Sequence, residues 1–237
     1  RREGRHDECD RDPRGGPLDA ARHLVEPLHL EALTASLKRA GHAVTGCDVS
    51  ADAVARFVKD GGAGAKTPAE AAEGADIVVS VVVNAAQTEA ILFGKDGVAE
   101  TLPKDSVFVS SATMDPDVAR RLARQLEATG RHYLDAPISG GAQRAAQGEL
   151  TILASGSAAA FAKARPALDA MAAKLYELGD AAGQGTAFKM INQLLAGVHI
   201  AAASEASVIC AAVPRLPWVA WNSATPSDMT GFAIRMP

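Results

Sequence analysis

Short apolar runs rich in β-branched residues alternate with alanine-rich stretches from about Leu33 onward. This alternation is typical of βαβ units, which bring parallel strands into one sheet and cover its faces with helices. The run at 77–83 is apolar at almost every position and therefore predicts a strand buried on both faces. The pattern predicts an α/β fold with a mostly parallel sheet and flanking helices.

The same pattern predicts individual strands and helix ends. The strands fall at 44–47, 77–83, 107–110, 133–134, 150–154 and 175–178. Asp115 before Pro116 predicts the start of one helix and Ser157 the start of another, because such residues cap helix N-termini. After the glycines at 183 and 185, a buried helix of roughly 25 residues is predicted to end before Pro214.

Charge and cysteine usage narrow the class of partner. The net charge is −4 with both signs interspersed, which argues against a nucleic-acid surface and a polybasic membrane anchor and favours a small-molecule partner. The 3 cysteines form no CxxC pair, which indicates neither a disulfide framework nor a zinc site and favours a reducing cytoplasm. Polar residues interrupt the apolar stretch at 190–213, so a membrane span is not expected there.

Asp48 follows a short apolar run, where a carboxylate could accept hydrogen bonds from an adenosine ribose and repel a 2′-phosphate, favouring NAD. The alternative is a turn residue that caps a helix at Ala51. A glycine-rich loop for the pyrophosphate is expected about 20 residues upstream, but residues 24–36 contain no glycine. The glycines at 61, 62 and 64 are interpreted as a helix-to-strand turn.

The segment 135–141 reads Asp-Ala-Pro-Ile-Ser-Gly-Gly and follows a predicted strand, where open α/β sheets bind their ligands. The Ser139 hydroxyl and the amides of Gly140 and Gly141 could bind a carboxylate, because glycine lets an anion approach the backbone. The alternative is an ordinary junction between a strand and a turn.

Lys189, Asn192 and Gln193 share one face of the predicted long helix, since they lie three and four residues apart. Removal of a lysine from water lowers the pKa of its amine, so Lys189 could take a hydroxyl proton while hydride leaves the same carbon. The alternative is a surface lysine on an amphipathic helix.

These segments resemble the β-hydroxyacid dehydrogenases, which carry D-x-P-x-S-G-G and G-x-G-x-x-x-K-x-x-N in this order. The similar spans are 37–50, 75–93, 110–113, 135–156 and 179–206, and the stretch from 37 to 206 that contains them covers roughly two-thirds of the chain. The resemblance implies a Rossmann-like domain that binds NAD and oxidises a small hydroxy acid. It implies that Lys189 acts as the general acid/base. The residues implied to bind the substrate are Ser139, Gly140, Gly141, Asn192 and Gln193, and those implied to bind NAD are Asp48, Val83, Asn84 and Thr113.

Within the family, residues 83–89 and 192–202 are most similar to the branch that oxidises L-threonate to 2-oxo-tetronate. Two alternatives in the same class are oxidation of 3-hydroxyisobutyrate and reduction of tartronate semialdehyde. An alternative of another class is a catalytically dead remnant, which the missing glycine loop favours.

The resemblance also sets the expected domain limits. Residues 31–182 are expected to form the NAD-binding domain and 183–213 a long interdomain helix. Both ends differ from the family and have the composition of GC-rich DNA read in a wrong frame. We therefore expect 1–30 to be disordered or aberrant and 214–237 to be an aberrant remnant of a helical C-terminal domain. The family forms homo-oligomers, and this change is expected to weaken such association.

Overall fold

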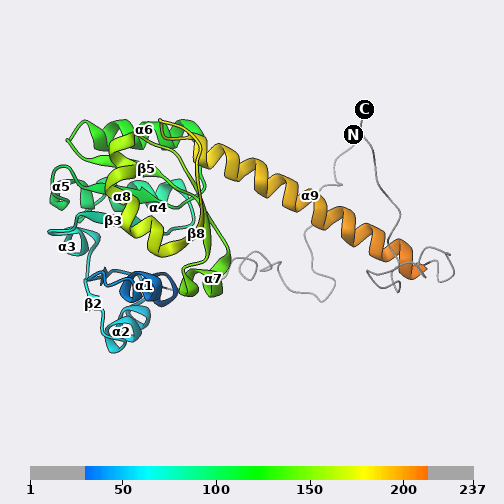
Figure 1. Ribbon diagram of the computed structural model, residues 1–237, viewed down its shortest axis with the longest axis horizontal. Coiled ribbons are helices and arrows are strands. Elements are labelled where there is room, and N and C mark those ends of the chain that lie inside the picture. Colours follow the sequence, from blue (N-terminus) through cyan, green and yellow to red (C-terminus); the bar gives the residue numbers. More distant parts are fainter. Residues whose placement is uncertain (1–29, 213–237) are drawn as a thin grey trace, which may run out of the picture. The chain divides into compact units, whose positions relative to one another are not determined.

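The computed structural model describes residues 30–212 (Figure 1). The predictions for 1–29 and 214–237 lie outside the described residues. The helices and strands follow in chain order: α1 (Leu30–Arg39), β1 (Thr45–Gly46), α2 (Ala51–Lys59), β2 (Ala63–Gly64), α3 (Pro68–Ala72), β3 (Ile77–Ser80), α4 (Ala85–Phe93), α5 (Val98–Thr101), β4 (Val107–Ser110), α6 (Pro116–Glu127), β5 (His132–Asp135), β6 (Ile138–Ser139), α7 (Gly141–Gln147), β7 (Leu150–Ala154), α8 (Ala158–Met171), β8 (Ala172–Glu177) and α9 (Gln184–Ala212).

The chain divides into two compact units, Arg1–Lys189 and Met190–Pro237. The first unit contains every strand of the described residues together with the helices up to the start of α9. The second unit contains the rest of α9. The boundary therefore falls inside one helix, directly after Lys189.

Three strands of the first unit form a parallel sheet in the order β3-β4-β5. The final residues of these strands, Ser80, Ser110 and Asp135, lie in one register row, and all three are buried. Polar side chains thus end three apolar strands at their carboxyl edge. This is the edge where open α/β sheets bind ligands.

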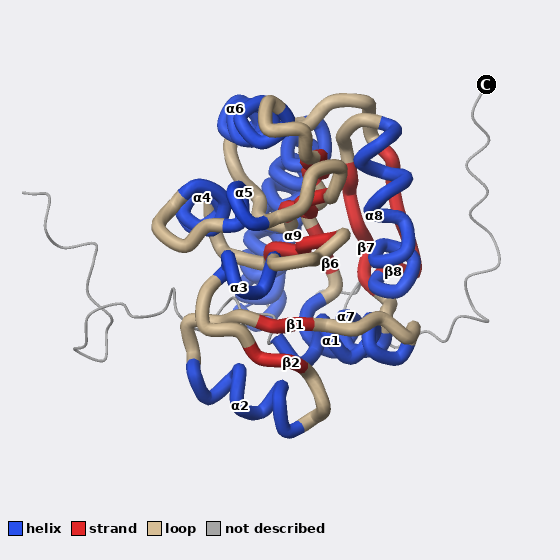
Figure 2. Tube along the Cα trace, turned by 90° about the vertical axis from the view of Figure 1, so that its left-hand side faces the viewer, coloured by secondary structure: helices blue, strands red, loops and turns tan. Residues whose placement is uncertain are grey.

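The parallel pair β1-β2 is separate from this sheet, although both belong to the first unit (Figure 2). A Rossmann sheet has the strand order 3-2-1-4-5-6, in which the first strand lies at the centre. The two sheets here correspond to the strands on either side of that central strand: β2-β1 on one side and β3-β4-β5 on the other. Within residues 30–212 no strand pairs with both β1 and β3.

Alternation along the strands separates two apolar cores. Val107, Val109 and Leu134 pack on the face covered by α8, whereas Phe108 and Tyr133 pack on the face covered by α6. The rings of Phe108 and Tyr133 stack with centroids 5.9 Å apart. Successive side chains of a strand point to opposite faces, so a continuous apolar run supplies both cores.

A second group of strands has the order β6-β7-β8, with β6-β7 antiparallel and β7-β8 parallel. An isolated antiparallel bridge between Asp135 and Ser155 connects β5 to the end of β7. The predicted α/β class and mostly parallel pairing are confirmed, but the strands form three small sheets. Strand β6 was not predicted because two residues are too short to show a period.

Both predicted helix starts are confirmed. The Asp115 carboxylate accepts a hydrogen bond of 2.7 Å from the Asp117 amide, and Pro116 occupies the first turn of α6. The Ser157 hydroxyl accepts from the Ala160 amide at 3.2 Å and caps α8. These side chains replace bonds that the first amides of a helix cannot make within it.

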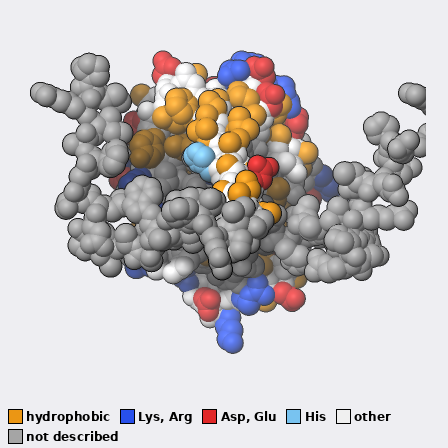
Figure 3. All heavy atoms as spheres, turned by 90° about the vertical axis from the view of Figure 1, so that its right-hand side faces the viewer, with side chains coloured by type: hydrophobic (Ala, Val, Ile, Leu, Met, Phe, Trp, Pro, Cys, Tyr) orange, Lys and Arg blue, Asp and Glu red, His pale blue; other side chains and the backbone are white. Residues whose placement is uncertain are grey.

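Helix α9 spans 29 residues, as predicted, but the expectation that it is buried is wrong. Every side chain described from 190 to 209 is exposed. Its exposed apolar side chains gather in Figure 3 and include Met190, Ile191, Leu194, Leu195, Val198, Ile200, Val208 and Ile209. A search of the described helices found none long and apolar enough to cross a membrane.

Candidate active site

The first turn of α9 is fixed to the carboxyl edge of the sheet by Asp135. The Asp135 Oδ2 atom accepts hydrogen bonds from the Gly183 amide at 3.0 Å and the Thr186 amide at 2.9 Å. It also accepts from the Ser155 hydroxyl at 3.3 Å. The first amides of a helix have no partner inside the helix and carry a positive partial charge, so a carboxylate suits this position.

Ser155 extends this arrangement to a third amide. Its Oγ atom accepts a hydrogen bond of 2.9 Å from the Gly185 amide. The Thr186 hydroxyl bonds to both the amide and the carbonyl of Met114, at 2.9 Å each. Asp135, Ser155 and Thr186 were not among the predicted site residues. A lone polar residue at the end of an apolar strand is the signal that could have indicated Asp135.

Gly183 and Gly185, the two glycines of the G-x-G-x-x-x-K-x-x-N motif, are required by close contacts with neighbouring atoms. A Cβ atom at Gly185 would lie 2.4 Å from the Leu153 carbonyl oxygen and 2.9 Å from that of Asp135. A Cβ at Gly183 would lie 2.8 Å from both the Pro116 carbonyl oxygen and the Arg120 guanidinium, and Gly183 has a φ of +100°. These positions let α9 begin directly against the strand ends.

Lys189 lies one turn after Gly185, so the two residues share a face of α9. Its side chain is 8% exposed, whereas Phe188 and Met190 on either side are 53% and 46% exposed. Burial lowers the pKa of the Lys189 amine below its usual value. No hydrogen bond or ion pair joins this amine to another described residue. An unpaired amine whose pKa is lowered in this way is suited to accept a proton.

Burial also perturbs the carboxyl group of Asp135. Loss of hydration raises its pKa from 3.8 to about 6, against the opposing effect of its hydrogen bonds from Thr186, Gly183 and Ser155. The Oδ1 atom is buried and has no hydrogen-bond partner among the described residues. This oxygen is the available position for a proton when the acid is neutral.

We predict a pH-dependent difference in stability between the wild type and Asp135→Asn. Between pH 3.8 and about 6 the folded protein retains a proton that the unfolded chain has released. The stabilising contribution is therefore complete below the lower value and is lost as pH rises through the higher one. Denaturant unfolding of both proteins should show that the free energy of unfolding of the variant, relative to that of the wild type, increases by about 3 kcal/mol between about pH 4 and about pH 7. An identical difference at both pH values would contradict this prediction.

The Ser139-Gly140-Gly141 turn lies between β6 and α7. Ser139 is half-buried and pairs with Thr151 of β7. Gly140 has a φ of +139° and Gly141 a φ of +71°, conformations that other residues rarely adopt. The turn therefore requires glycine, and the first amides of α7 have no partner within that helix.

The predicted cofactor residues follow three different strands. Asp48 is exposed after β1, and its Oδ1 accepts from the Ser50 amide at 2.7 Å. The alternative interpretation of Asp48 as a turn residue is confirmed by this bond, but its capping part is wrong, because the Ser50 hydroxyl caps α2. Val83 and Asn84 are exposed after β3, where the Asn84 side chain caps α4. Thr113 follows β4 and is half-buried.

Asn192 and Gln193 lie on α9, three and four residues after Lys189, and both side chains are exposed. They belong to the second compact unit. Their predicted part in substrate binding stays a prediction. All the other predicted site residues, Lys189 included, lie in the first unit.

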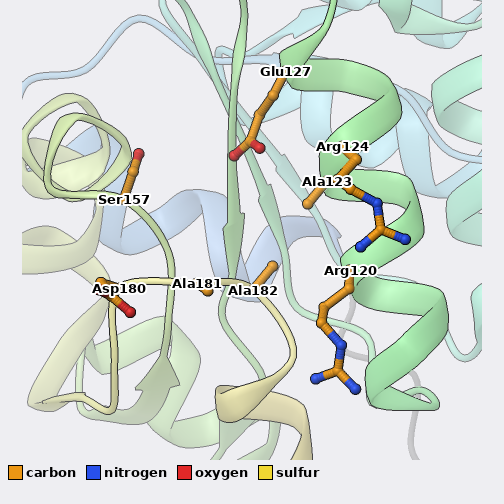
Figure 4. Close-up of a pocket in the computed structure, with 8 residues that line it drawn as sticks. All are labelled: Arg120, Ala123, Arg124, Glu127, Ser157, Asp180, Ala181 and Ala182. Atoms are coloured by element: carbon orange, nitrogen blue, oxygen red, sulfur yellow. The ribbon is translucent and has the colours of Figure 1, made fainter.

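The described residues also form two surface clefts, but neither cleft is lined by a predicted site residue. One cleft of about 230 Å³ lies between α6, the start of α8 and the segment before α9. Figure 4 shows Arg120 and Arg124 on one side of it and Ser157 and Asp180 on the other. The second, of about 260 Å³, lies between α1 and α2. No group of three or more metal-ligating side chains was found in the described part of the chain.

Comparison with known proteins supports this description. Residues 31–179 match the family described as the NAD binding domain of 6-phosphogluconate dehydrogenase. L-threonate dehydrogenase of Cupriavidus necator is 48% identical over 174 residues, covering 73% of this chain and 59% of that protein. 3-Hydroxyisobutyrate dehydrogenase of Pseudomonas aeruginosa is 34% identical over 174 residues, covering 73% and 58%. The chain thus spans about 59% of the length of the relative named first.

A solved structure of 3-hydroxyisobutyrate dehydrogenase from Salmonella typhimurium matches with a TM-score of 0.74 and 39% identity, over 89% of this chain and 72% of that one. The parallel strands, their helices and the carboxyl-edge site define an α/β dinucleotide-binding domain. The chain belongs to the β-hydroxyacid dehydrogenase family. The resemblance inferred from the two sequence motifs is thereby confirmed.

Proposed function

We propose that this chain forms the core of an NAD-dependent dehydrogenase that oxidises L-threonate to 2-oxo-tetronate, with Lys189 as general acid/base. The observation that carries the proposal is the largely buried residue Lys189, which follows a tightly held helix start and whose amine has a pKa lowered by partial loss of hydration. The 48% identity to an L-threonate dehydrogenase supports the choice of substrate.

The proposed reaction removes a proton and a hydride from the hydroxyl-bearing carbon C2. Lys189 accepts the hydroxyl proton, and the C2–O bond becomes a carbonyl as the C2–H bond breaks. NAD, when bound, supplies the acceptor for this hydride. A neutral amine is the form that accepts a proton, and burial increases its population at physiological pH.

The substrate carboxylate is proposed to bind at the Ser139-Gly140-Gly141 turn, with Asn192 and Gln193 as further ligands. Strand register supports this position: Ser139 pairs with β7, and the Leu153 carbonyl of the same strand contacts Gly185 of α9. Lys189 shares a helix face with Gly185. The turn and the start of α9 therefore adjoin the same strand of the first unit.

The residues present fit the two ends of a dinucleotide. Asp48 has an exposed carboxylate for a ribose, and Val83, Asn84 and Thr113 follow strands β3 and β4 for the nicotinamide end. Residues 30–44, ahead of β1, contain Gly41 as their single glycine. The described residues thus provide no glycine-rich loop for the pyrophosphate, and we expect weak NAD binding.

A substrate panel tests the proposed reaction through NADH absorbance. L-threonate should give the highest kcat/KM with NAD, compared with 3-hydroxyisobutyrate and, in the reverse direction, tartronate semialdehyde. A preference for 3-hydroxyisobutyrate would overturn the substrate assignment and leave the dehydrogenase class standing.

A second candidate function is a non-catalytic domain that has lost turnover. The absence of a glycine-rich loop from residues 30–44 favours it. Calorimetric titration with NAD distinguishes the two, since micromolar binding corresponds to about −8 kcal/mol and would exclude a dead pocket.

Replacing Asp48 with serine should weaken NAD binding by roughly 10-fold and reduce the preference for NAD over NADP, because the ribose loses a charged acceptor. Calorimetry with both dinucleotides measures this effect. The control is Asp52→Ser, another exposed carboxylate at the start of α2. Equal affinities in the two variants would remove Asp48 from the cofactor site.

Cytoplasmic location and a weakened form of the family's homo-oligomer remain part of this proposal. The dispersed charge and the three separated cysteines support the first. Sedimentation of the purified chain tests the second.

A further inference from the structure

We propose that Asp135 is a positioning residue for Lys189: together with Ser155 it binds the first amides of α9 and so holds the largely buried Lys189 in place. The inference deepens the proposed function and rests on it for its catalytic meaning. Its structural content, the dependence of the Lys189 environment on Asp135, can be measured without turnover.

The start of α9, up to Lys189, belongs to the first unit and packs within it. Gly185, Thr186 and Lys189 are the helix positions that are buried, and they share one helical face. From Met190 to Ile209 all side chains are exposed. Burial of Lys189 therefore depends on where the first turn of the helix is held.

That first turn has no capping side chain of its own, because the residue before Gln184 is a glycine. Three of its amides, those of Gly183, Gly185 and Thr186, are instead bound by side chains from β5 and from the end of β7. Asp135 accepts two of them directly and also accepts the hydrogen bond of Ser155, which binds the third. One carboxylate oxygen thus organises the whole set.

The first turn of α9 can move little relative to the strand ends. Gly185 lies against the carbonyl oxygens of Leu153 and Asp135, so the helix cannot approach the strands more closely. Retreat is opposed by the hydrogen bonds of Asp135 and Ser155 and by the pair between Thr186 and Met114. Lys189 lies about 6 Å further along the helix axis, so a shift or fraying of the first turn displaces its amine.

Competitive acetylation with acetic anhydride across a pH series measures the environment of Lys189. Mass spectrometry of the peptide that contains Lys189 gives its titration midpoint, and the exposed Lys174 of the same molecule serves as the internal reference for reagent. The experiment uses the full chain, and circular dichroism of each variant reports folding.

Three variants provide the comparison. In Asp135→Ala the Lys189 midpoint should rise by about one unit, because the released amine becomes hydrated. Asp135→Asn offers one oxygen at the same place and should restore most of the wild-type midpoint. Ser155→Ala removes one amide partner and should give a smaller rise. If Asp135→Ala does not fold, the Ser155→Ala result decides.

An unchanged Lys189 midpoint in folded Asp135→Ala, or in Ser155→Ala if the first variant is unfolded, overturns the inference. Failure of Asp135→Asn to restore the midpoint also overturns it, because the proposed role needs only the acceptor oxygen. A dehydrogenase assay on the same samples separates the two proposals. Absent turnover in the wild type, with the midpoint still shifted by Asp135→Ala, removes the proposed function and supports the positioning role.

Discussion

Replacement of Lys189 by methionine is expected to lower kcat/KM for L-threonate by roughly 100- to 10,000-fold, the range that a positioned general acid/base contributes. Methionine keeps the length of the side chain and suits a buried position, so the variant should remain folded. The rate is measured by NADH formation over a pH series. The wild type should lose activity as pH falls, because protonation of the Lys189 amine removes the base.

Lys174→Met is the matched control, because Lys174 is exposed on β8 of the same unit. This variant should retain wild-type kinetics and the wild-type pH profile. Loss of activity to the same extent in both variants would show that charge or stability, rather than proton transfer at Lys189, explains the effect. Retained activity in Lys189→Met would remove Lys189 from the mechanism.

Gly185→Ala is expected to destabilise the protein by roughly 1–3 kcal/mol, the usual cost of forcing an extra carbon into a packed site. The new Cβ would lie 2.4 Å from the Leu153 carbonyl oxygen, a backbone atom that cannot rotate away. Relief requires α9 to move from the strand ends, which should also lower activity through Lys189. Denaturant unfolding and the NADH assay measure the two effects.

Gly197→Ala makes the same change on the same helix at a position with nothing within 4 Å of the added carbon. Alanine favours a helix over glycine by about 0.5–1 kcal/mol, so this control should stabilise or leave the protein unchanged. Equal destabilisation by the two substitutions would mean that the contact with Leu153 is not responsible.

Several apolar strands were predictable because their pattern is local, although the strand predicted at 77–83 ends at Ser80 and is mostly only partly buried. Strands 107–110 and 150–154 have the predicted limits, and β5 extends the prediction at 133–134 by one residue at each end. Strands β1, β2 and β6 have two residues each, so their extent depends on the pairing partner rather than on a repeat. The long helix was predicted from the same local signals, whereas its exposure was not.

The candidate site shows the same division. The sequence by itself determined which groups are available, namely an acid after one strand, two glycines at a helix start and a lysine one turn later. Only the tertiary structure decided that the Asp135 carboxylate binds amides 48 and 51 positions further along the chain. Contacts at such separations depend on how strands and helices pack, and the burial that perturbs Asp135 and Lys189 arises from that packing.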